Sequence, residues 1–155
     1  MKKILHLIVI ALTALSLSSC LEHGLVELDT YDGCEVTSVY GVYHRYYLST
    51  TIPVSGERQV AQAPLDVSNP IQDVNACTYT FDVSLPTNFP ASENGSVNVS
   101  KLVVILNIST AAVIEPVDGA PTLGVPGDWS KPNKYKITAG DGTTKTWTVT
   151  LNFKK

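Results

Sequence analysis

The sequence has few of the residues that enzymes use for catalysis. Its 155 residues include only three histidines and three cysteines, and no Gly-x-Ser-x-Gly, His-Glu-x-x-His or Cys-x-x-Cys pattern occurs among them. These patterns are typical of serine hydrolases, zinc peptidases and thiol oxidoreductases. His44 lies in a segment with strand character, where a solvated strand residue is the simplest interpretation. The sequence therefore predicts a protein that is not an enzyme, with no catalytic residue and no cofactor.

The chain also lacks a basic cluster and a cluster of acids. It has 11 lysines and arginines against 14 acidic residues, for a formal net charge of −3 at pH 7. Binding to nucleic acid requires a basic patch or stripe, so nucleic acid is excluded as the predicted partner. Calcium requires several converging carboxylates, whereas Asp118, Asp128 and Asp141 lie singly in glycine-containing turns. No metal site is predicted.

The longest apolar run, from Ile4 to Leu17, is too short to span a bilayer. It follows the basic start Met1-Lys2-Lys3 and ends at the polar pair Ser18-Ser19. A membrane-spanning helix needs roughly 20 apolar residues. A basic start, a short apolar core and small residues at its end are typical of a secretory signal peptide. We therefore predict that residues 1–19 are a signal peptide and that the protein is exported.

Cys20 directly follows this leader. The tetrapeptide Leu17-Ser18-Ser19-Cys20 resembles the lipobox of bacterial lipoproteins, in which the cysteine becomes the diacylated first residue of the processed chain. Each buried methylene contributes about 0.8 kcal/mol, so two or three acyl chains hold a protein durably at a membrane. The resemblance predicts lipidation of Cys20 and an anchor in the outer membrane. The alternative is an ordinary signal peptide with an unmodified Cys20.

Cys34 and Cys77 are the cysteines that remain once Cys20 is lipidated. An exported compartment permits disulfide bonds, and a bridge that closes this loop would stabilise the fold by roughly 3–4 kcal/mol. These residues are therefore a candidate disulfide pair. The alternative is two free thiols that pack as small hydrophobic side chains.

Residues 20–33 have no sustained hydrophobic period and form the predicted tether, whereas strand patterns fill the domain predicted for residues 34–155. Alternation of apolar and polar residues is clearest in a strand before Pro86 and in a hairpin that turns at Gly140-Asp141-Gly142-Thr143. No window shows a helical stripe. Seven short strands between Gly/Pro turns predict an all-β sandwich of two sheets. The strands are Glu35–Leu48, Arg58–Ala63, Ala76–Leu85, Val99–Ile108, Ala111–Glu115, Tyr135–Ala139 and Trp147–Phe153.

The last third of the chain carries three motifs: Ile114-Glu115-Pro116, Gly127-Asp128-Trp129-Ser130-Lys131-Pro132 and the hairpin from Tyr135 to Val149. Together they resemble the closing half of immunoglobulin-like (cadherin-like) domains of unknown function in Bacteroidetes lipoproteins. The resemblance implies an immunoglobulin-like fold and a place in the cell envelope, but little about activity, since such modules serve as spacers, glycan binders and adhesin parts. Leu21-Glu22-His23-Gly24 departs from the acidic cluster that accompanies surface export, so surface and periplasmic orientations both stay open.

The candidate binding residues are aromatic. One predicted strand carries His44, Arg45 and four tyrosines, of which alternation puts Tyr40 and Tyr46 on one face and Tyr43 and Tyr47 on the other. One pair is expected in the core, and the other is free to stack on a sugar or a protein. The alternative is cross-strand pairing that only stabilises the sheet. Trp129 is either a ligand contact or a structural plug. The candidate ligand contacts are therefore Tyr43, Tyr47 and Trp129.

The combination of a lipobox, one sandwich domain and no catalytic motif predicts a non-enzymatic accessory module. Its predicted partners are the membrane, through the lipid anchor, and a glycan or a protein of the cell envelope. The alternative is a structural spacer or subunit of an envelope assembly with no ligand of its own.

Mass spectrometry of the protein from its native host tests the predicted anchor. We expect the processed chain to begin at Cys20 and to carry two or three acyl chains there, because the apolar leader is removed at the lipobox. An intact leader, or a residue 20 without acyl chains, would contradict this prediction.

Overall fold

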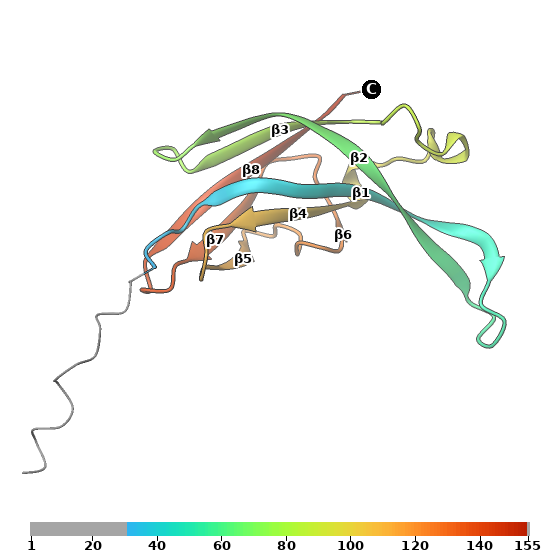
Figure 1. Ribbon diagram of the computed structural model, residues 1–155, viewed down its shortest axis with the longest axis horizontal. Coiled ribbons are helices and arrows are strands. Elements are labelled where there is room, and N and C mark those ends of the chain that lie inside the picture. The colour runs from blue at the N-terminus through green and yellow to red at the C-terminus, as the bar shows by residue number, and fades with distance from the viewer. Residues whose placement is uncertain (1–30, 155) are drawn as a thin grey trace, which may run out of the picture. The chain divides into compact units, whose positions relative to one another are not determined.

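The computed structural model describes residues 31–154, and all its regular elements except two short 3-10 turns are strands (Figure 1). This confirms the predicted all-β class. No helix in the described part of the chain is long and apolar enough to cross a membrane. The predicted signal peptide and Cys20 lie outside the described residues. The strands are β1 (Val36–Thr51), β2 (Arg58–Asp73), β3 (Thr78–Ser84), β4 (Leu102–Ile108), β5 (Val113–Val117), β6 (Pro126–Gly127), β7 (Asn133–Thr138) and β8 (Thr144–Lys154); the 3-10 turns are η1 (Ala91–Glu93) and η2 (Val99–Lys101).

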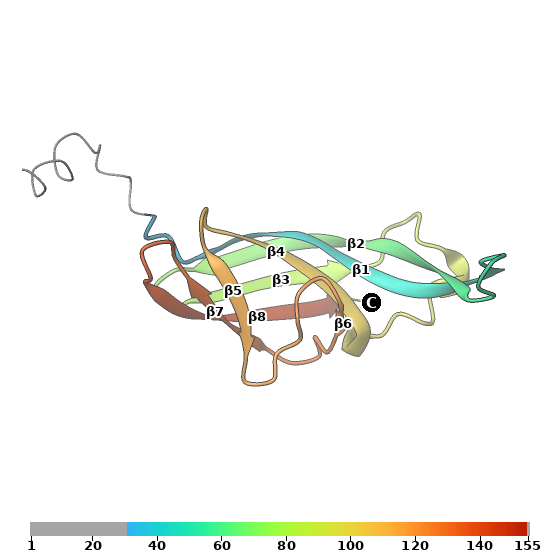
Figure 2. The same cartoon turned by 90° about the horizontal axis from the view of Figure 1, so that it is seen from below.

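The strands form one sheet in the order β5-β7-β8-β3-β2-β1-β4-β6, which curls into a half-barrel (Figures 1 and 2). All neighbours are antiparallel except β3 and β8, which are parallel. The predicted immunoglobulin-like sandwich of two separate sheets is therefore wrong. The physical reason is β2, which pairs with β1 through Leu65 and with β3 from Asp66 onward, so that one strand joins both halves.

Strand β2 is also ten residues longer than the segment that the sequence predicted, which ended at Ala63. Pro64 does not stop it, because Pro64 lies where β2 has β1 as a neighbour but not yet β3. A strand with one neighbour uses the N–H of only alternate residues in that ladder, so one missing N–H is tolerated. Further along, Asn69 takes a positive φ of 49°, and the pairing with β3 is irregular between Ser68 and Ile71.

The inner face of the half-barrel holds the core, and alternation predicts it correctly in β3 and β8. Tyr79, Phe81 and Val83 are buried in β3, with half-buried polar residues between them. In β8, the fully buried Trp147 donates from Nε1 to the carbonyl oxygen of Cys34 at 2.8 Å. This bond ties the beginning of the domain to its core. It also satisfies a polar group that would be costly to bury alone.

The first described residues belong to the same compact unit, which extends from Tyr31. The backbone N–H of Asp141, in the β7–β8 turn, donates to the carbonyl oxygen of Tyr31 at 3.1 Å. The end of the predicted tether therefore contacts the domain. Within this unit, the blue start of the ribbon and the loop between β1 and β2 lie at opposite ends in both views (Figures 1 and 2).

Strand β6 packs tightly against the loop that precedes it. A Cβ atom on Gly127 would overlap the side chain of Pro121. We therefore expect Gly127→Ala to lower the free energy of unfolding by about 1–3 kcal/mol, because overpacking forces neighbouring groups to move. Urea denaturation measures this change. Gly95→Ala is the matched control, since no atom lies within 4 Å of a Cβ there; equal effects of the two substitutions would contradict the prediction.

Candidate functional site

Strands β1 and β2 extend beyond the rest of the sheet as a two-stranded projection (Figure 1). The pairing of β1 with β4 ends at His44 and Leu102, whereas its pairing with β2 continues through Tyr47 and Val60 to Thr51 and Arg58. We call residues 45–62 the hairpin arm. From Arg45 onward, β1 has lost its neighbour on the β4 side. Side chains from both faces of the strand can therefore border the space beside this free edge.

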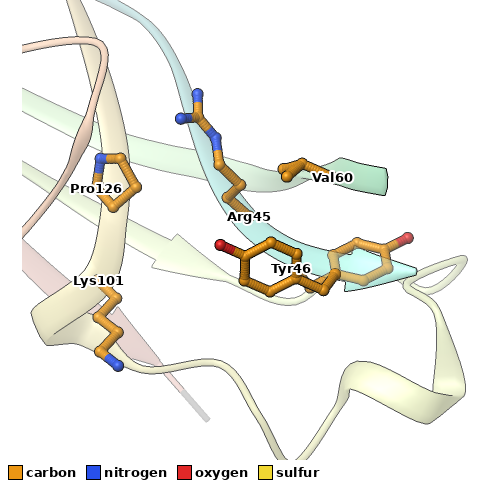
Figure 3. Close-up of a pocket in the computed structure, with 6 residues that line it drawn as sticks. Arg45, Tyr46, Val60, Lys101 and Pro126 are labelled. Atoms are coloured by element: carbon orange, nitrogen blue, oxygen red, sulfur yellow. The ribbon is translucent and has the colours of Figure 1, made fainter. Parts of the chain in front are cut away.

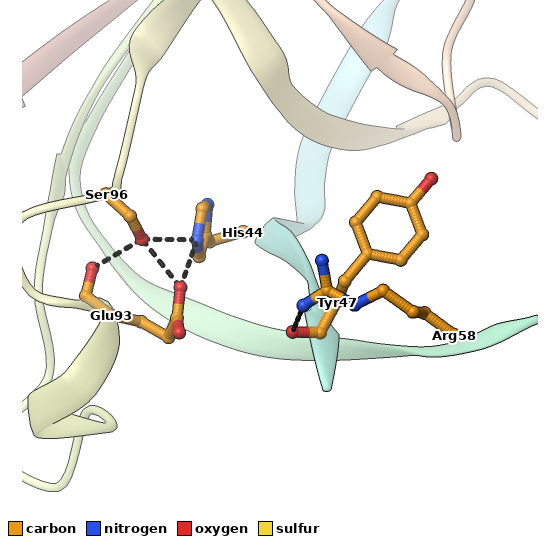
Figure 4. A network of polar contacts seen from close by, with 5 residues as sticks. All are labelled: His44, Tyr47, Arg58, Glu93 and Ser96. Carbon is orange, nitrogen blue, oxygen red and sulfur yellow. Dashed lines mark hydrogen bonds and ion pairs between the residues drawn. The ribbon is translucent and has the colours of Figure 1, made fainter. Parts of the chain in front are cut away.

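Polar contacts across the hairpin arm hold its two strands together. The Arg58 guanidinium donates to the carbonyl oxygens of Leu48 at 3.1 Å and Tyr47 at 3.2 Å. Its Cζ atom also lies 5.2 Å from the centroid of the Tyr47 ring (Figure 4). A two-stranded hairpin alone is only marginally stable in water, and an exposed cation–π contact contributes about 0.5–1 kcal/mol. Arg58 therefore favours the observed orientation of the Tyr47 ring, which remains 62% exposed.

Tyr46 marks the point where the core ends on the inner face of β1. Val42 and His44, the preceding residues on that face, are buried, whereas Tyr46 is half-buried. Its ring lies parallel to the His44 ring, with centroids 5.7 Å apart and an interplanar angle of 9°. Tyr46 therefore offers part of its ring to solvent from a position that the core holds in place.

Two neighbouring depressions lie at the base of the hairpin arm, and we call them together the hairpin groove. They share four lining residues: Arg45, Tyr46, Tyr47 and Lys101. The smaller depression, of about 160 Å³, is completed by Val60 and Pro126 (Figure 3). The larger and more open one, of about 450 Å³, is completed by His44, Arg58, Glu93 and Ser96.

A network around His44 closes the inner end of the larger depression (Figure 4). The Ser96 Oγ lies 3.2 Å from His44 Nε2 and donates to Glu93 Oε2 at 2.6 Å. Glu93 Oε2 is itself 3.5 Å from His44 Nε2. Because the Ser96 hydroxyl donates to Glu93, its oxygen is free to accept from a protonated Nε2. The network therefore holds the loop that contains η1 and Ser96 against β1.

The same three residue types form catalytic triads, but their arrangement here is different. In a triad, the serine and the acid contact opposite nitrogens of the histidine ring. Here both Ser96 and Glu93 contact Nε2, while Nδ1 of His44 is buried without a hydrogen-bond partner. No acid orients the ring from the Nδ1 side, so this geometry does not activate Ser96 as a nucleophile. Its role in the described structure is to position the loop.

Electrostatically, the hairpin groove is positive although the chain is acidic. Both arginines of the sequence, Arg45 and Arg58, line it together with Lys101. None of the three forms an ion pair with a carboxylate of residues 31–154, whereas the three lysines at positions 134, 136 and 154 do. The hydrogen bond from Ser96, followed by the contacts with His44, lowers the pKa of Glu93, so this single acid is ionised. Three uncompensated cations thus outnumber one carboxylate.

Of the three aromatic residues proposed from sequence, only Tyr47 lies in the groove. Tyr43 covers the backbone of Gly41, where a Cβ atom would lie 2.7 Å from the Tyr43 hydroxyl oxygen. Trp129 is 1% exposed and stacks on Tyr135 at 6.1 Å, so its interpretation as a ligand contact is wrong and it is a structural plug. Tyr135, the partner of Trp129 in this stack, is also buried, and burial raises the pKa of its hydroxyl group.

Tyr46 was expected to share a face with Tyr40, and this expectation is wrong. The pairing of β1 with β4 shifts between Val39 and Gly41, and such a bulge interrupts alternation. Tyr40 is consequently 66% exposed and does not lie on the core face of β1. Lys101 lies inside the predicted strand Val99–Ile108, and Arg58 begins the predicted strand Arg58–Ala63. Strand alternation alone indicates no binding role for either residue.

The two candidate disulfide cysteines are free thiols in the structure. Cys34 is buried in the core. Cys77 lies in the β2–β3 turn with a positive φ of 51°, and its thiol donates to the carbonyl oxygen of Val74 at 3.5 Å. The predicted strand Ala76–Leu85 includes Cys77, but β3 begins at Thr78. Among residues 31–154, no group of three or more potential metal ligands gathers.

Comparisons with known proteins identify relatives of the chain. The family model described as DUF5018-related matches residues 36–150. The crystal structure of a Bacteroides fragilis protein, provisionally named as secreted, is similar with a TM-score of 0.70 and 38% sequence identity. That similarity covers 81% of this chain and 99% of the other. No curated protein matches.

The Glu93 contacts predict an acid-sensitive stability. A carboxyl group whose pKa is lowered in the folded state contributes stability above its ordinary value of 4.5 and loses it as the pH falls through the folded pKa. We expect the unfolding free energies of wild type and Glu93→Gln to differ most near neutral pH and to converge below 4.5.

Urea denaturation from pH 7 to pH 3 measures this convergence. The hydrogen bond from Ser96 is the largest cause of the lowered pKa of Glu93. When both proteins also carry Ser96→Ala, the difference between their unfolding free energies should therefore change less with pH. Stability curves for wild type and Glu93→Gln that run parallel at all pH values would show that the network does not act in this way.

Proposed function

This chain belongs to the DUF5018-related family, and we propose its function from the hairpin groove, because the family designation specifies no activity. The protein is an exported, lipid-anchored, non-enzymatic module that binds a glycan. Export is supported by the predicted leader and by the name of the Bacteroides fragilis relative. The anchor is supported by the lipobox that ends at Cys20.

The observation that carries glycan binding is the aromatic surface of the hairpin arm. Tyr47 is 62% exposed, and Arg58 favours the observed orientation of its ring. Tyr46 lies next to it with one side supported by the His44 ring. Rings with an apolar face and a polar tip suit the mixed surface of a sugar, and fixing them beforehand lowers the entropy lost on binding.

The position of the groove supports the same function. The described chain begins at one end of the unit, and the hairpin arm projects from the opposite end (Figures 1 and 2). Within the described domain, the groove is therefore distant from the end at which the chain enters (Figures 1 and 2). A groove at this end is accessible to a ligand in solution, which suits a binding module.

Tyr47→Ala provides the test, with residues 21–155 screened on a glycan array and hits measured by calorimetry. We expect the substitution to weaken glycan binding about tenfold or more, because it removes a pre-positioned ring. Tyr40→Ala is the matched control: Tyr40 lies on the same strand and is 66% exposed, but it does not line the groove.

Two results would contradict the proposed function. Equal loss of binding in the Tyr47 and Tyr40 variants would place the glycan elsewhere. Silence on every glycan, together with stoichiometric co-purification of an envelope protein from the native host, would favour the structural alternative.

A further inference from the structure

The smaller depression of the hairpin groove combines cations and aromatic rings without any acid. It is lined by Arg45, Lys101, Tyr46 and Tyr47, with Val60 and Pro126 completing its walls (Figure 3). The one carboxylate of the groove, Glu93, lines only the larger depression. The carboxylate is therefore confined to the larger depression, whereas Arg45 and Lys101 line both.

The two cations of the smaller depression have unused hydrogen-bonding capacity. One Arg45 nitrogen donates to Gln62 Oε1 at 3.3 Å, and this leaves most of its five N–H donors free. Lys101 is exposed and forms no ion pair with the described carboxylates. A guanidinium binds a carboxylate or sulfate through its planar fork, and an ammonium adds a point charge. Each of the two can therefore bind an anionic group of a ligand.

The positions of these cations follow from the fold. Lys101 ends η2 immediately before Leu102, and Leu102 is the residue of β4 that pairs with His44, next to Arg45. The last β1–β4 pair therefore brings a lysine and an arginine close to the free β1 edge, with their charged ends pointing apart (Figure 3). Arg58 adds a third positive charge, because its own partners are neutral carbonyl oxygens.

From this arrangement we infer that the ligand is an acidic saccharide, a sugar chain that carries carboxylate or sulfate groups. Sugar rings of the chain stack on Tyr46 and on Tyr47, which project from opposite faces of β1, and its anionic groups bind Arg45 and Lys101. The inference rests on the proposed function, since it specifies the ligand class of the same groove. Three cations in an acidic chain do not provide the broad basic surface that nucleic acid requires.

The experiment compares matched charged and neutral ligands by calorimetry with residues 21–155. The probes are oligogalacturonate and its methyl ester, chondroitin sulfate and its desulfated form, and neutral xylan and mannan oligosaccharides. We expect at least one acidic probe to bind, its neutral derivative to bind about tenfold more weakly or worse, and the acidic affinity to fall with added salt. The two acidic series distinguish carboxylate from sulfate recognition.

Charge variants connect this preference to the named residues. Lys101→Gln and Arg45→Gln should each weaken acidic binding about tenfold and reduce its salt dependence, since each removes one charge-assisted contact. Lys145→Gln is the control; this lysine lies on β8 opposite Ile137 and does not line the groove. If either neutral variant fails to fold, Arg45→Lys and Lys101→Arg provide a second test. Both substitutions keep the positive charge and should retain most of the binding.

The outcomes separate this inference from the proposed function. Neutral probes that bind as well as the acidic ones, with binding still dependent on Tyr47, would overturn the acidic ligand but leave glycan binding intact. Acidic binding that is unaffected by the Arg45 and Lys101 variants would also overturn it. Failure of every probe and every array glycan would overturn both.

Discussion

The unequal length of paired strands is the constraint on which the rest of this structure depends. Strands β1 and β2 each have 16 residues, whereas β4 has seven and ends its pairing at His44. The half-barrel closes its core with the shorter strands, and the surplus of β1 and β2 becomes the hairpin arm. A free strand edge with side chains on both faces arises where β4 stops. The hairpin groove is therefore a direct consequence of strand pairing, not a separate insertion.

Rigid support turns this edge into a candidate binding site. The His44 ring supports Tyr46 from the core side, and Arg58, on the second strand of the arm, favours the observed orientation of Tyr47. Ser96 and Glu93 hold the neighbouring loop to His44 at distances of 3.2 and 3.5 Å. A groove whose walls are already ordered loses less conformational entropy when a ligand binds. Its uncompensated cations then favour one class of ligand over another.

The sequence predicts part of this architecture, where local pattern and tertiary environment agree. Alternation located the core residues of β3 and β8 because each strand is buried on one face. It failed for β2, because Pro64 breaks the sequence pattern but not the pairing. It also failed for the tyrosines of β1, since a bulge near Tyr40 changes which face each one occupies. Lys101 joins the groove only through the long-range pairing of Leu102, which no local pattern reveals.

An NMR titration of ¹⁵N-labelled residues 21–155 with an acidic oligosaccharide tests most directly whether the hairpin arm carries the binding site. The account predicts that the largest amide shifts occur at residues 45–47, 58–62 and 101, and that the β7–β8 turn at the opposite end of the unit stays unchanged. Shifts concentrated in that turn, or along the free edge of β5, with none in the hairpin arm, would contradict it.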